Sequence, residues 1–294
     1  MKLIVNFAPT GMIPTKKMTP YVPVSVEEIV ENVLEAVNIG ITMVHLHARD
    51  EQNGEPTYKA SVYGRIIEGI RRYAPDLVIG VSTSGRTYNQ FEKRIECLQL
   101  EGHCKPDMAS LTLSSLNFNQ QASINDPDMI KSLALEMQRR DIIPELEVFD
   151  VGMINYARYL EKKELIRPPY YFNLICGNIA CAQADLLHIG MMLRDLPPDS
   201  LWSLGGVGDS QVTVNSIAIV MGGGVRVGLE DNIWYDPQRE RLASNADLIR
   251  RIHQLAKDCG REVMTPLELR SLLKLGKKPG QYGRVATEAT GTGM

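Results

Sequence analysis

Short apolar runs alternate with amphipathic segments along nearly all of the 294-residue chain, and this alternation limits the possible folds more than any other feature. Eight apolar runs have the length and flanking turn residues of β-strands, and a segment with helical periodicity follows each of them. Strands that are separated by helices pair in parallel, so the pattern predicts a parallel sheet covered by helices. The expected strands are residues 3–6, 43–47, 77–82, 108–111, 143–149, 171–175, 200–204 and 224–229. The expected helices are residues 26–39, 60–72, 90–100, 127–139, 154–163, 183–193, 211–221, 246–259 and 266–273.

Eight strand–helix units predict an α/β fold of the (β/α)8 TIM barrel type, which has about 250 residues. The alternative is an open doubly wound sheet, which normally carries a Gly-rich phosphate loop after its first strand. Residues 8–12 read Ala-Pro-Thr-Gly-Met and lack the G-x-G-x-x-G spacing. No linker divides the chain, so we expect one barrel domain over residues 1–275 and an exposed tail over residues 276–294. Ser25, followed three residues later by Glu28, predicts a capping box at the first helix.

The composition is that of a globular protein with neither a nucleic-acid nor a membrane partner. Hydrophobic residues make up 44% of the chain and charged residues 23%, the net charge is -3, and no basic stripe is present. No apolar run reaches the roughly 18 residues of a membrane span, and the N-terminus does not resemble a signal peptide. The five cysteines lack C-x-x-C spacing, which favours reduced thiols. We therefore expect a cytoplasmic protein.

The second expected strand ends in two histidines, His45 and His47. Side chains alternate between the two faces of a strand, so these imidazoles point the same way and can share one ligand. A site with two histidines and one carboxylate suits zinc and leaves a coordination position open for chemistry. An isolated His-x-His also arises by chance on half-buried strands, so the interpretation needs a second motif.

The last expected strand supplies this second motif. Arg226 and Glu230 alternate with apolar residues, so both should face the same side of the strand. Buried charges need partners, and a metal bound by Glu230 and the two histidines would provide one. Arg226 could then pair with Asp231 or Glu147, or hold a substrate carboxylate. The alternative is a structural network of ion pairs that closes the last strand against the first.

Other polar residues end neighbouring strands. Catalytic groups of (β/α)8 barrels lie at the carboxyl ends of the strands, so these residues should meet at one mouth of the barrel. They are His45 and His47 on the second strand, Ser82 on the third, Ser110 on the fourth, and Glu145 and Glu147 on the fifth.

Over nearly its whole length the chain resembles the β-keto acid cleavage enzymes. This zinc-dependent (β/α)8 family was first described as a domain of unknown function and includes the 3-keto-5-aminohexanoate cleavage enzyme of lysine fermentation. Each shared motif is modest alone, and their order and spacing together are specific. The motifs are Thr10-Gly11, His45-Leu46-His47-Ala48-Arg49-Asp50, Ser82-Thr83, Met108-Ala109-Ser110-Leu111, Pro144-Glu145-Leu146-Glu147, Val225-Arg226-Val227-Gly228-Leu229-Glu230-Asp231-Asn232 and Ser244-Asn245-Ala246.

The resemblance implies a metal site and a substrate site. His45, His47 and Glu230 would hold one Zn²⁺ per chain, and Ser82 and Ser110 would bind the substrate carboxylate. The family reaction joins a β-keto acid to acetyl-CoA and returns acetoacetate and a new acyl-CoA. Relatives commonly form homotetramers, so the resemblance also implies a homo-oligomer.

The same resemblance implies the catalytic base, Asp231, which would be tuned by Arg226 and Glu147. The residue types fit this chemistry, because a proton between a ketone and a carboxylate is removable when a Lewis acid stabilises the ketone oxygen.

Four departures from the family pattern concern the outer part of the site. Ile13 stands where the lysine-fermenting enzyme has a glutamate that pairs with the substrate amino group, so 3-keto-5-aminohexanoate is not the expected substrate. Gly222-Gly223-Gly224 replaces Gly-Gly-His, and Gly206-Val207-Gly208-Asp209 replaces Gly-x-Gly-Arg. Ser82-Thr83-Ser84-Gly85 replaces Ser-Thr-Gly-Gly and is followed by Arg86. We therefore expect the far end of the substrate, and the contact with CoA, to differ from those of relatives.

Two other functions use the same residues. The first is a metal-dependent hydrolase or aldolase on the same barrel, which would not need acetyl-CoA. The second is a non-catalytic binding barrel, which would lack bound metal. His103, His188 and His253 lie in expected loops or helices, and we expect them to be surface or packing residues.

Overall fold

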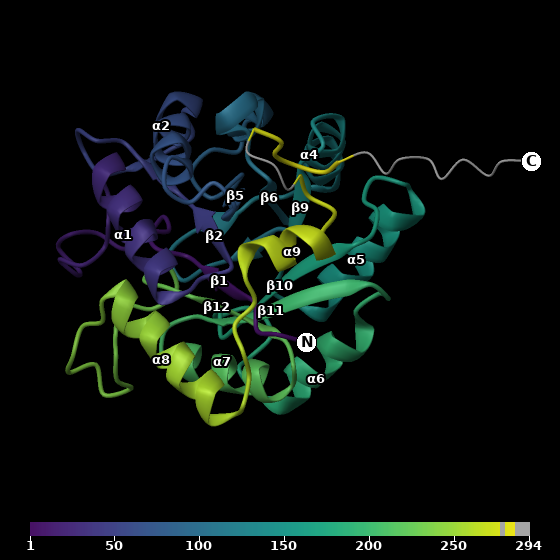
Figure 1. Ribbon diagram of the computed structural model, residues 1–294. Coiled ribbons are helices and arrows are strands. Elements are labelled where there is room, and N and C mark those ends of the chain that lie inside the picture. The colour runs from purple at the N-terminus through teal and green to yellow at the C-terminus, as the bar shows by residue number, and fades with distance from the viewer. Residues whose placement is uncertain (277–279, 286–294) are drawn as a thin grey trace, which may run out of the picture.

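The computed structural model describes residues 1–276 and 280–285. Among these residues, eight parallel strands close into a barrel in the order β1-β12-β11-β10-β9-β6-β5-β2, with helices around it (Figure 1). The closed sheet confirms the predicted (β/α)8 fold and excludes the open doubly wound alternative. The barrel strands are β1 (Val5–Phe7), β2 (Met43–Leu46), β5 (Val78–Val81), β6 (Met108–Thr112), β9 (Ile143–Val148), β10 (Tyr170–Cys176), β11 (Ser200–Gly206) and β12 (Gly224–Val227).

Several helices begin at a residue whose side chain accepts a hydrogen bond from the first helical turn. At α1 (Val26–Ile39) the predicted capping box is present: the Ser25 hydroxyl accepts from the Glu28 N–H at 3.1 Å, and the Glu28 carboxylate accepts from the Ser25 N–H at 3.2 Å. The helix ends at Gly40, whose φ of 118° a residue with a side chain rarely adopts. The other helices are α2 (Ala60–Arg71), α3 (Phe91–Arg94), α4 (Pro127–Arg139), α5 (Val151–Lys162), α6 (Leu186–Asp195), α7 (Ser210–Val220), α8 (Asn245–Asp258) and α9 (Pro266–Leu272).

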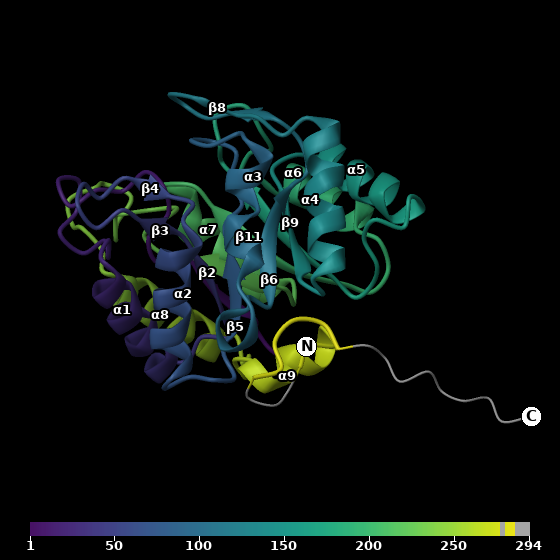
Figure 2. The same ribbon diagram turned by 90° about the horizontal axis from the view of Figure 1, so that it is seen from above.

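The barrel interior is apolar at one end and polar further along. Inward-facing residues at the strand starts form a buried cluster with residues of the C-terminal segment, and α9 lies across this end (Figures 1 and 2). Because every second residue of a strand points inward, the next inward positions are polar and buried. The apolar layer contains Ile4, Met43, Val78, Met108, Ile143 and Tyr171. The polar layer above it contains Asn6, His45, Ser110, Glu145 and Asn173.

Two expected elements are corrected by the structure. The helix expected over residues 90–100 is only α3, followed by 3₁₀ turns at Glu96–Gln99 and Gly102–Cys104. Arg94 is turned inward there, and its guanidinium donates to the Thr83 carbonyl at 2.7 Å, so tertiary contacts override helical periodicity.

The strand expected over residues 224–229 ends at Val227. A Cβ at Gly228 would lie 2.0 Å from the Ala8 carbonyl oxygen, so only glycine fits where the chain leaves the strand and turns.

Two short antiparallel hairpins, absent from the sequence-based expectation, rise at the mouth opposite α9 (Figure 2). They are β3 (Ala48–Arg49) with β4 (Pro56–Thr57), and β7 (Leu116–Asn117) with β8 (Ala122–Ser123). The other expected elements are present, with slightly shifted ends.

The expectation of an exposed tail after residue 275 is wrong at Tyr282, which is 6% exposed. Its ring stacks on Arg71, with 3.2 Å from the guanidinium carbon to the ring centroid, and the Gly283 N–H donates to Asp107 at 3.1 Å. Residues 277–279 and 286–294 of the expected tail lie outside the described residues. Among the described helices, none is both long and apolar enough to span a bilayer.

Candidate active site

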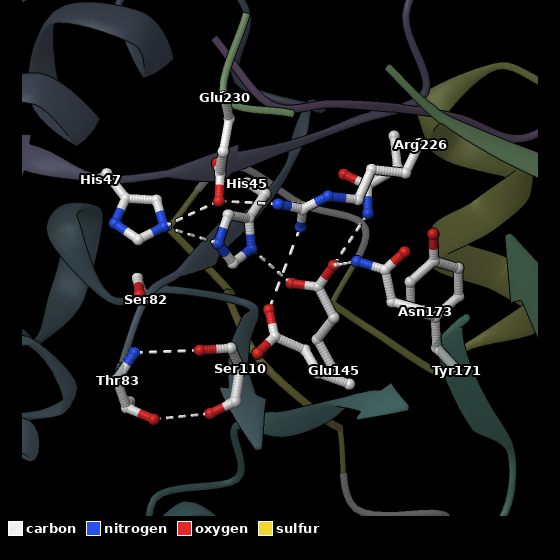
Figure 3. A network of polar contacts seen from close by, with 12 residues as sticks. His45, His47, Ser82, Thr83, Ser110, Glu145, Tyr171, Asn173, Arg226 and Glu230 are labelled. Atoms are coloured by element: carbon white, nitrogen blue, oxygen red, sulfur yellow. Dashed lines mark hydrogen bonds and ion pairs between the residues drawn. The ribbon is translucent and has the colours of Figure 1, made fainter. Parts of the chain in front are cut away.

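Three side chains expected to bind a metal meet at the mouth of the barrel. His45 ends the inward face of β2, His47 follows it, and Glu230 lies in the turn after β12. One ligand atom from each lies within 4.8 Å of the others. The Nε2 atoms of His45 and His47 are 3.2 Å apart, and His47 Nε2 is 3.1 Å from Glu230 Oε1 (Figure 3). The sequence-based expectation about Glu230 is corrected in one respect, because it reaches the histidines through a turn and not through strand alternation.

The chemistry of these atoms fits a divalent cation. Two imidazole nitrogens and a carboxylate oxygen in such proximity are all electron-pair donors, so a proton or a cation must lie among them. The other Glu230 oxygen, Oε2, is buried and has no hydrogen-bond partner within the described part of the chain. Two nitrogens and one carboxylate are a donor set of catalytic zinc sites.

Gly11, in the loop after β1, makes room for Glu230. A Cβ at this position would lie 2.5 Å from Glu230 Cγ, and the φ of +64° also favours glycine. The loop itself is held by Arg49, which donates to the carbonyls of Gly11 at 3.0 Å and Pro14 at 2.9 Å. The backbone of the loop after β1, which is distant from β12 in sequence and next to it in the barrel, therefore positions the carboxylate ligand.

Glu145 orients His45 from the side opposite the ligand cluster (Figure 3). Its Oε2 lies 2.7 Å from Nδ1 of His45, and its Oε1 accepts from the side-chain amides of Asn6 at 2.8 Å and Asn173 at 3.0 Å. The carboxylate is fully buried, and although burial alone raises its pKa, His45 lowers it below the ordinary value. An ionised Glu145 accepts a hydrogen bond from Nδ1–H of His45 and leaves Nε2 of His45 as the ligand atom.

The two histidines differ in electrostatics. Burial lowers the pKa of His45, but the carboxylates of Glu145 and Glu230 outweigh burial and raise it to about 9. Burial is the largest effect on His47 and lowers its pKa. Burial raises the pKa of Glu230, yet Arg226 and both histidines bring it well below the ordinary value. Metal-free protein therefore holds one extra proton on His45 beside an ionised Glu230.

Arg226 connects the ligand cluster to Asp231. Its Nε and Nη2 donate to the two oxygens of Asp231 at 2.8 and 3.2 Å, and Nη2 is 2.7 Å from Glu230 Oε1. Nη1 lies 3.9 Å from a Glu147 oxygen and has no hydrogen-bond partner among the described residues. Of the partners considered from the sequence, Asp231 is thus the closest and Glu147 is within ion-pair range.

Two further carboxyl groups have raised pKa values. Burial raises the pKa of Asp231 although Arg226 opposes it, and burial raises the pKa of Glu147 although His45 and Arg226 oppose it. Glu147 also accepts from the Thr112 hydroxyl at 2.6 Å. A buried carboxylate with a raised pKa is a stronger base than one in water.

The two serines expected to bind substrate occupy different depths. Ser82, directly after β5, lines the cavity at the mouth, and its hydroxyl accepts from the Ser84 N–H at 3.2 Å. Ser110, on β6, is buried and does not line that cavity. Its hydroxyl accepts from the Thr83 N–H at 3.0 Å, and the Thr83 hydroxyl donates to the Ser110 carbonyl at 2.6 Å (Figure 3).

A cavity of about 450 Å³ opens over these residues. It reaches from His47, Glu230 and Asp231 to the loop after β1 and to the β7–β8 hairpin. Such a volume suits a small-molecule substrate site. The mouth therefore combines a cluster of metal-type ligands, a buried basic carboxylate and space for a substrate.

Sequence reasoning missed several residues that shape this site. The sequence predicts that Glu145 lies on a strand and on the same face as Glu147, and it does not indicate which group Glu145 contacts. Asn6, Asn173 and Thr112 had no signal in the sequence, because each acts through a neighbour on another strand.

Known proteins resemble this chain in sequence over nearly its whole length. A sequence model of the family described as beta-keto acid cleavage enzyme matches residues 2–275. The chain is 38% identical over 279 residues to the 3-keto-5-aminohexanoate cleavage enzyme of Fusobacterium nucleatum subsp. nucleatum, covering 94% of this chain and 99% of that protein. It is 36% identical over 275 residues to the 3-oxoadipate:acetyl-CoA acetyltransferase of Cupriavidus necator, covering 92% and 94% respectively.

Among solved structures, the apo structure of ObcA is similar in fold, with a TM-score of 0.76 at 21% identity. The match covers 87% of this chain and 66% of the ObcA chain, so the chain spans about two thirds of the length of ObcA. At this identity the likeness concerns the barrel fold alone.

Proposed function

Since the chain belongs to the β-keto acid cleavage enzyme family, we propose that it is a zinc-dependent acyltransferase acting on a β-keto acid and acetyl-CoA. In the overall reaction the carboxymethyl part of the keto acid gains the acetyl group and leaves as acetoacetate. The acyl part is transferred to the sulfur of CoA. The observation that carries the proposal is the convergence of His45, His47 and Glu230 at the mouth of the barrel. Asp231, the proposed base, follows Glu230 in the sequence and lines the same cavity.

In this proposal His45, His47 and Glu230 hold one zinc ion per chain. Bound zinc supplies a Lewis acid that stabilises the negative charge developing on the ketone oxygen when the neighbouring carbon loses a proton. Glu145 keeps the Nδ1 proton on His45, so that Nε2 faces the ligand cluster.

Asp231 is proposed to take the proton from the carbon between the ketone and the carboxylate. The bidentate contact with Arg226 fixes the orientation of its carboxylate, and burial raises its pKa, which strengthens it as a base. Glu147, near Nη1 of Arg226, is proposed to tune this pair.

Ser82 is proposed to donate a hydrogen bond to the substrate carboxylate, because its hydroxyl lines the cavity and the contact from the Ser84 N–H uses only an oxygen lone pair. Ser110 is proposed to support this contact from below by holding Thr83. A hydroxyl fixed in this way at one end of the substrate restricts the orientation of the substrate and lowers the entropic cost of reaction.

The test is product analysis with metal-loaded protein. Incubation with β-keto acids and acetyl-CoA should yield acetoacetate and the matching acyl-CoA, and protein purified without chelator should contain about one zinc per chain. His47→Ala should lose the metal, whereas Asp231→Asn should keep the metal and lose the reaction. Products that form equally well without acetyl-CoA would instead identify a hydrolase or aldolase, and metal-free protein whose melting does not respond to zinc would identify a binding barrel.

We also propose a cytoplasmic location and a homotetramer. All five cysteines are free thiols in the structure, which suits a reducing compartment. Light scattering of the purified protein measures the oligomeric state, and fractionation of cells that express it measures the location.

A further inference from the structure

Arg86 is a charged residue of the cavity wall that the proposed reaction leaves unused. Two other arginines line the cavity, and both have carboxylate partners: Arg226 pairs with Asp231 and Glu230, and Arg239 pairs with Asp209 at 3.0 Å. Within residues 1–276 and 280–285, the Arg86 guanidinium has neither a hydrogen bond nor an ion pair, and its nitrogens are not sealed from the cavity.

The position of Arg86 is fixed by its own loop. The Ser82 hydroxyl accepts from the Ser84 N–H at 3.2 Å, and the Ser84 hydroxyl accepts from the Arg86 N–H at 3.3 Å. Beneath them, a Cβ at Gly85 would lie 2.5 Å from the Ile124 carbonyl oxygen. The loop therefore packs too closely for any side chain at that position, and it presents Arg86 in one place.

The guanidinium itself is held by an aromatic ring. Its carbon lies 3.3 Å from the centroid of Phe118, in the turn between β7 and β8, and Phe118 packs edge-on against Phe149. Stacking occupies one face of the planar guanidinium and leaves the N–H groups at its edge able to bind an anion. Burial lowers the pKa of Arg86, and the carboxylates of Glu230 and Glu147 oppose this effect. Arg86 lines the same cavity as Glu230 and Glu147.

We propose that Arg86 selects β-keto acids that carry a second carboxylate, at the end remote from the reacting one. This inference rests on the proposed function, which places the reacting carboxylate at Ser82 and the ketone oxygen at the ligand cluster. A planar fork of donors matches a carboxylate in a bidentate contact. A substrate with an ammonium group at the same place would meet Arg86 as a like charge, and Ile13 on the cavity wall provides no counter-charge.

The test compares 3-oxoadipate with 3-oxohexanoate, which has the same chain length and a methyl group in place of the second carboxylate. The wild type should have a higher kcat/KM for the diacid. Arg86→Met keeps the alkyl stem on Phe118 and removes the charge, so kcat/KM for the diacid should fall by about 10- to 100-fold, through KM, with little change for the monoacid. Arg86→Lys should restore part of this loss.

The matched control is Arg241→Met, which removes a guanidinium stacked on Tyr235 at 4.3 Å outside the cavity and should leave the preference between the two acids unchanged. Melting temperatures establish that each variant is folded. An equal loss on both acids would overturn the inference, because Arg86 would then hold the reacting carboxylate. A rise confined to the KM of acetyl-CoA would also overturn it, because a CoA phosphate would then be the ligand.

A binding measurement separates this inference from the proposed function. Calorimetry with zinc-loaded protein, without acetyl-CoA, should give tighter binding of the diacid than of the monoacid, and Arg86→Met should abolish the difference. If this preference appears while no β-keto acid is turned over, the proposed function fails and the carboxylate site stands. If binding shows no preference, the carboxylate site is refuted even where turnover occurs.

Discussion

Glu145→Gln tests whether a buried carboxylate outside the ligand cluster controls the metal site. Glu145 contacts no expected substrate atom, and its Oε2 lies 2.7 Å from Nδ1 of His45. The substitution preserves side-chain volume and replaces a charged acceptor with a neutral amide. The two asparagines at Oε1 can rotate their amides to accommodate it, because Asn6 Oδ1 and Asn173 Oδ1 have no partner among the described residues. The variant is therefore expected to fold.

The expected loss follows from the hydrogen bond. A bond to a charged group contributes about 1.5–3 kcal/mol and a neutral one about 0.5–1.5 kcal/mol, so the exchange costs roughly 1–1.5 kcal/mol, or about tenfold in affinity. Loss of a partner that orients a metal-bound histidine typically costs about 10- to 100-fold. We expect the zinc Kd of Glu145→Gln to rise within this range when it is measured above pH 9, where His45 is neutral in both proteins and proton competition does not differ. In the metal-free protein, the pKa of His45, about 9 in the wild type, should fall.

The assay is zinc competition with a chromophoric chelator, together with an NMR titration of the metal-free protein. Glu147→Gln is the matched control, since Glu147 lies on the same face of β9, two residues further along, and does not contact His45 Nδ1. It should retain zinc affinity while turnover falls. An unchanged zinc Kd in folded Glu145→Gln, or an equal loss in both variants, would refute the assigned role of Glu145.

Three further predictions concern geometry, protons and helix stability. Gly11→Ala should weaken zinc binding, measured by the same competition, because its Cβ would lie 2.5 Å from Glu230 Cγ; unchanged affinity would contradict this. Apparent zinc affinity should rise with pH up to about 9, because the raised pKa keeps metal-free His45 protonated below that value and only neutral imidazole binds metal. Zinc binding should therefore release a proton. Calorimetry in buffers of different ionisation enthalpy measures this proton, and a binding heat that does not depend on the buffer would contradict the prediction. Ser25→Ala should lower the free energy of unfolding by about 1 kcal/mol in urea titrations, since the Glu28 N–H loses its cap; equal midpoints would contradict it.

The two missed hairpins and the broken helix show where local patterns are insufficient. A strand of two residues, such as Ala48–Arg49, is too short to produce a periodic signal. The segment around Arg94 has helical periodicity, yet burying its guanidinium against Thr83 ends the helix early. In both cases contacts between residues distant in sequence determine the backbone.

The barrel and the pairing of His45 with His47 could be predicted from the chain alone, because strand alternation and helical periodicity depend on neighbouring residues. The charged residues of the last expected strand added Glu230 to that pair, and the family resemblance implied the same ligand. The folded chain shows that Glu230 reaches the histidines by a turn at Gly228 and a close approach to Gly11. The support of His45 by Glu145 and the stacking of Arg86 on Phe118 appear only after folding. Each joins segments that no local pattern relates, since only closure of the barrel brings the separate strand ends to one mouth.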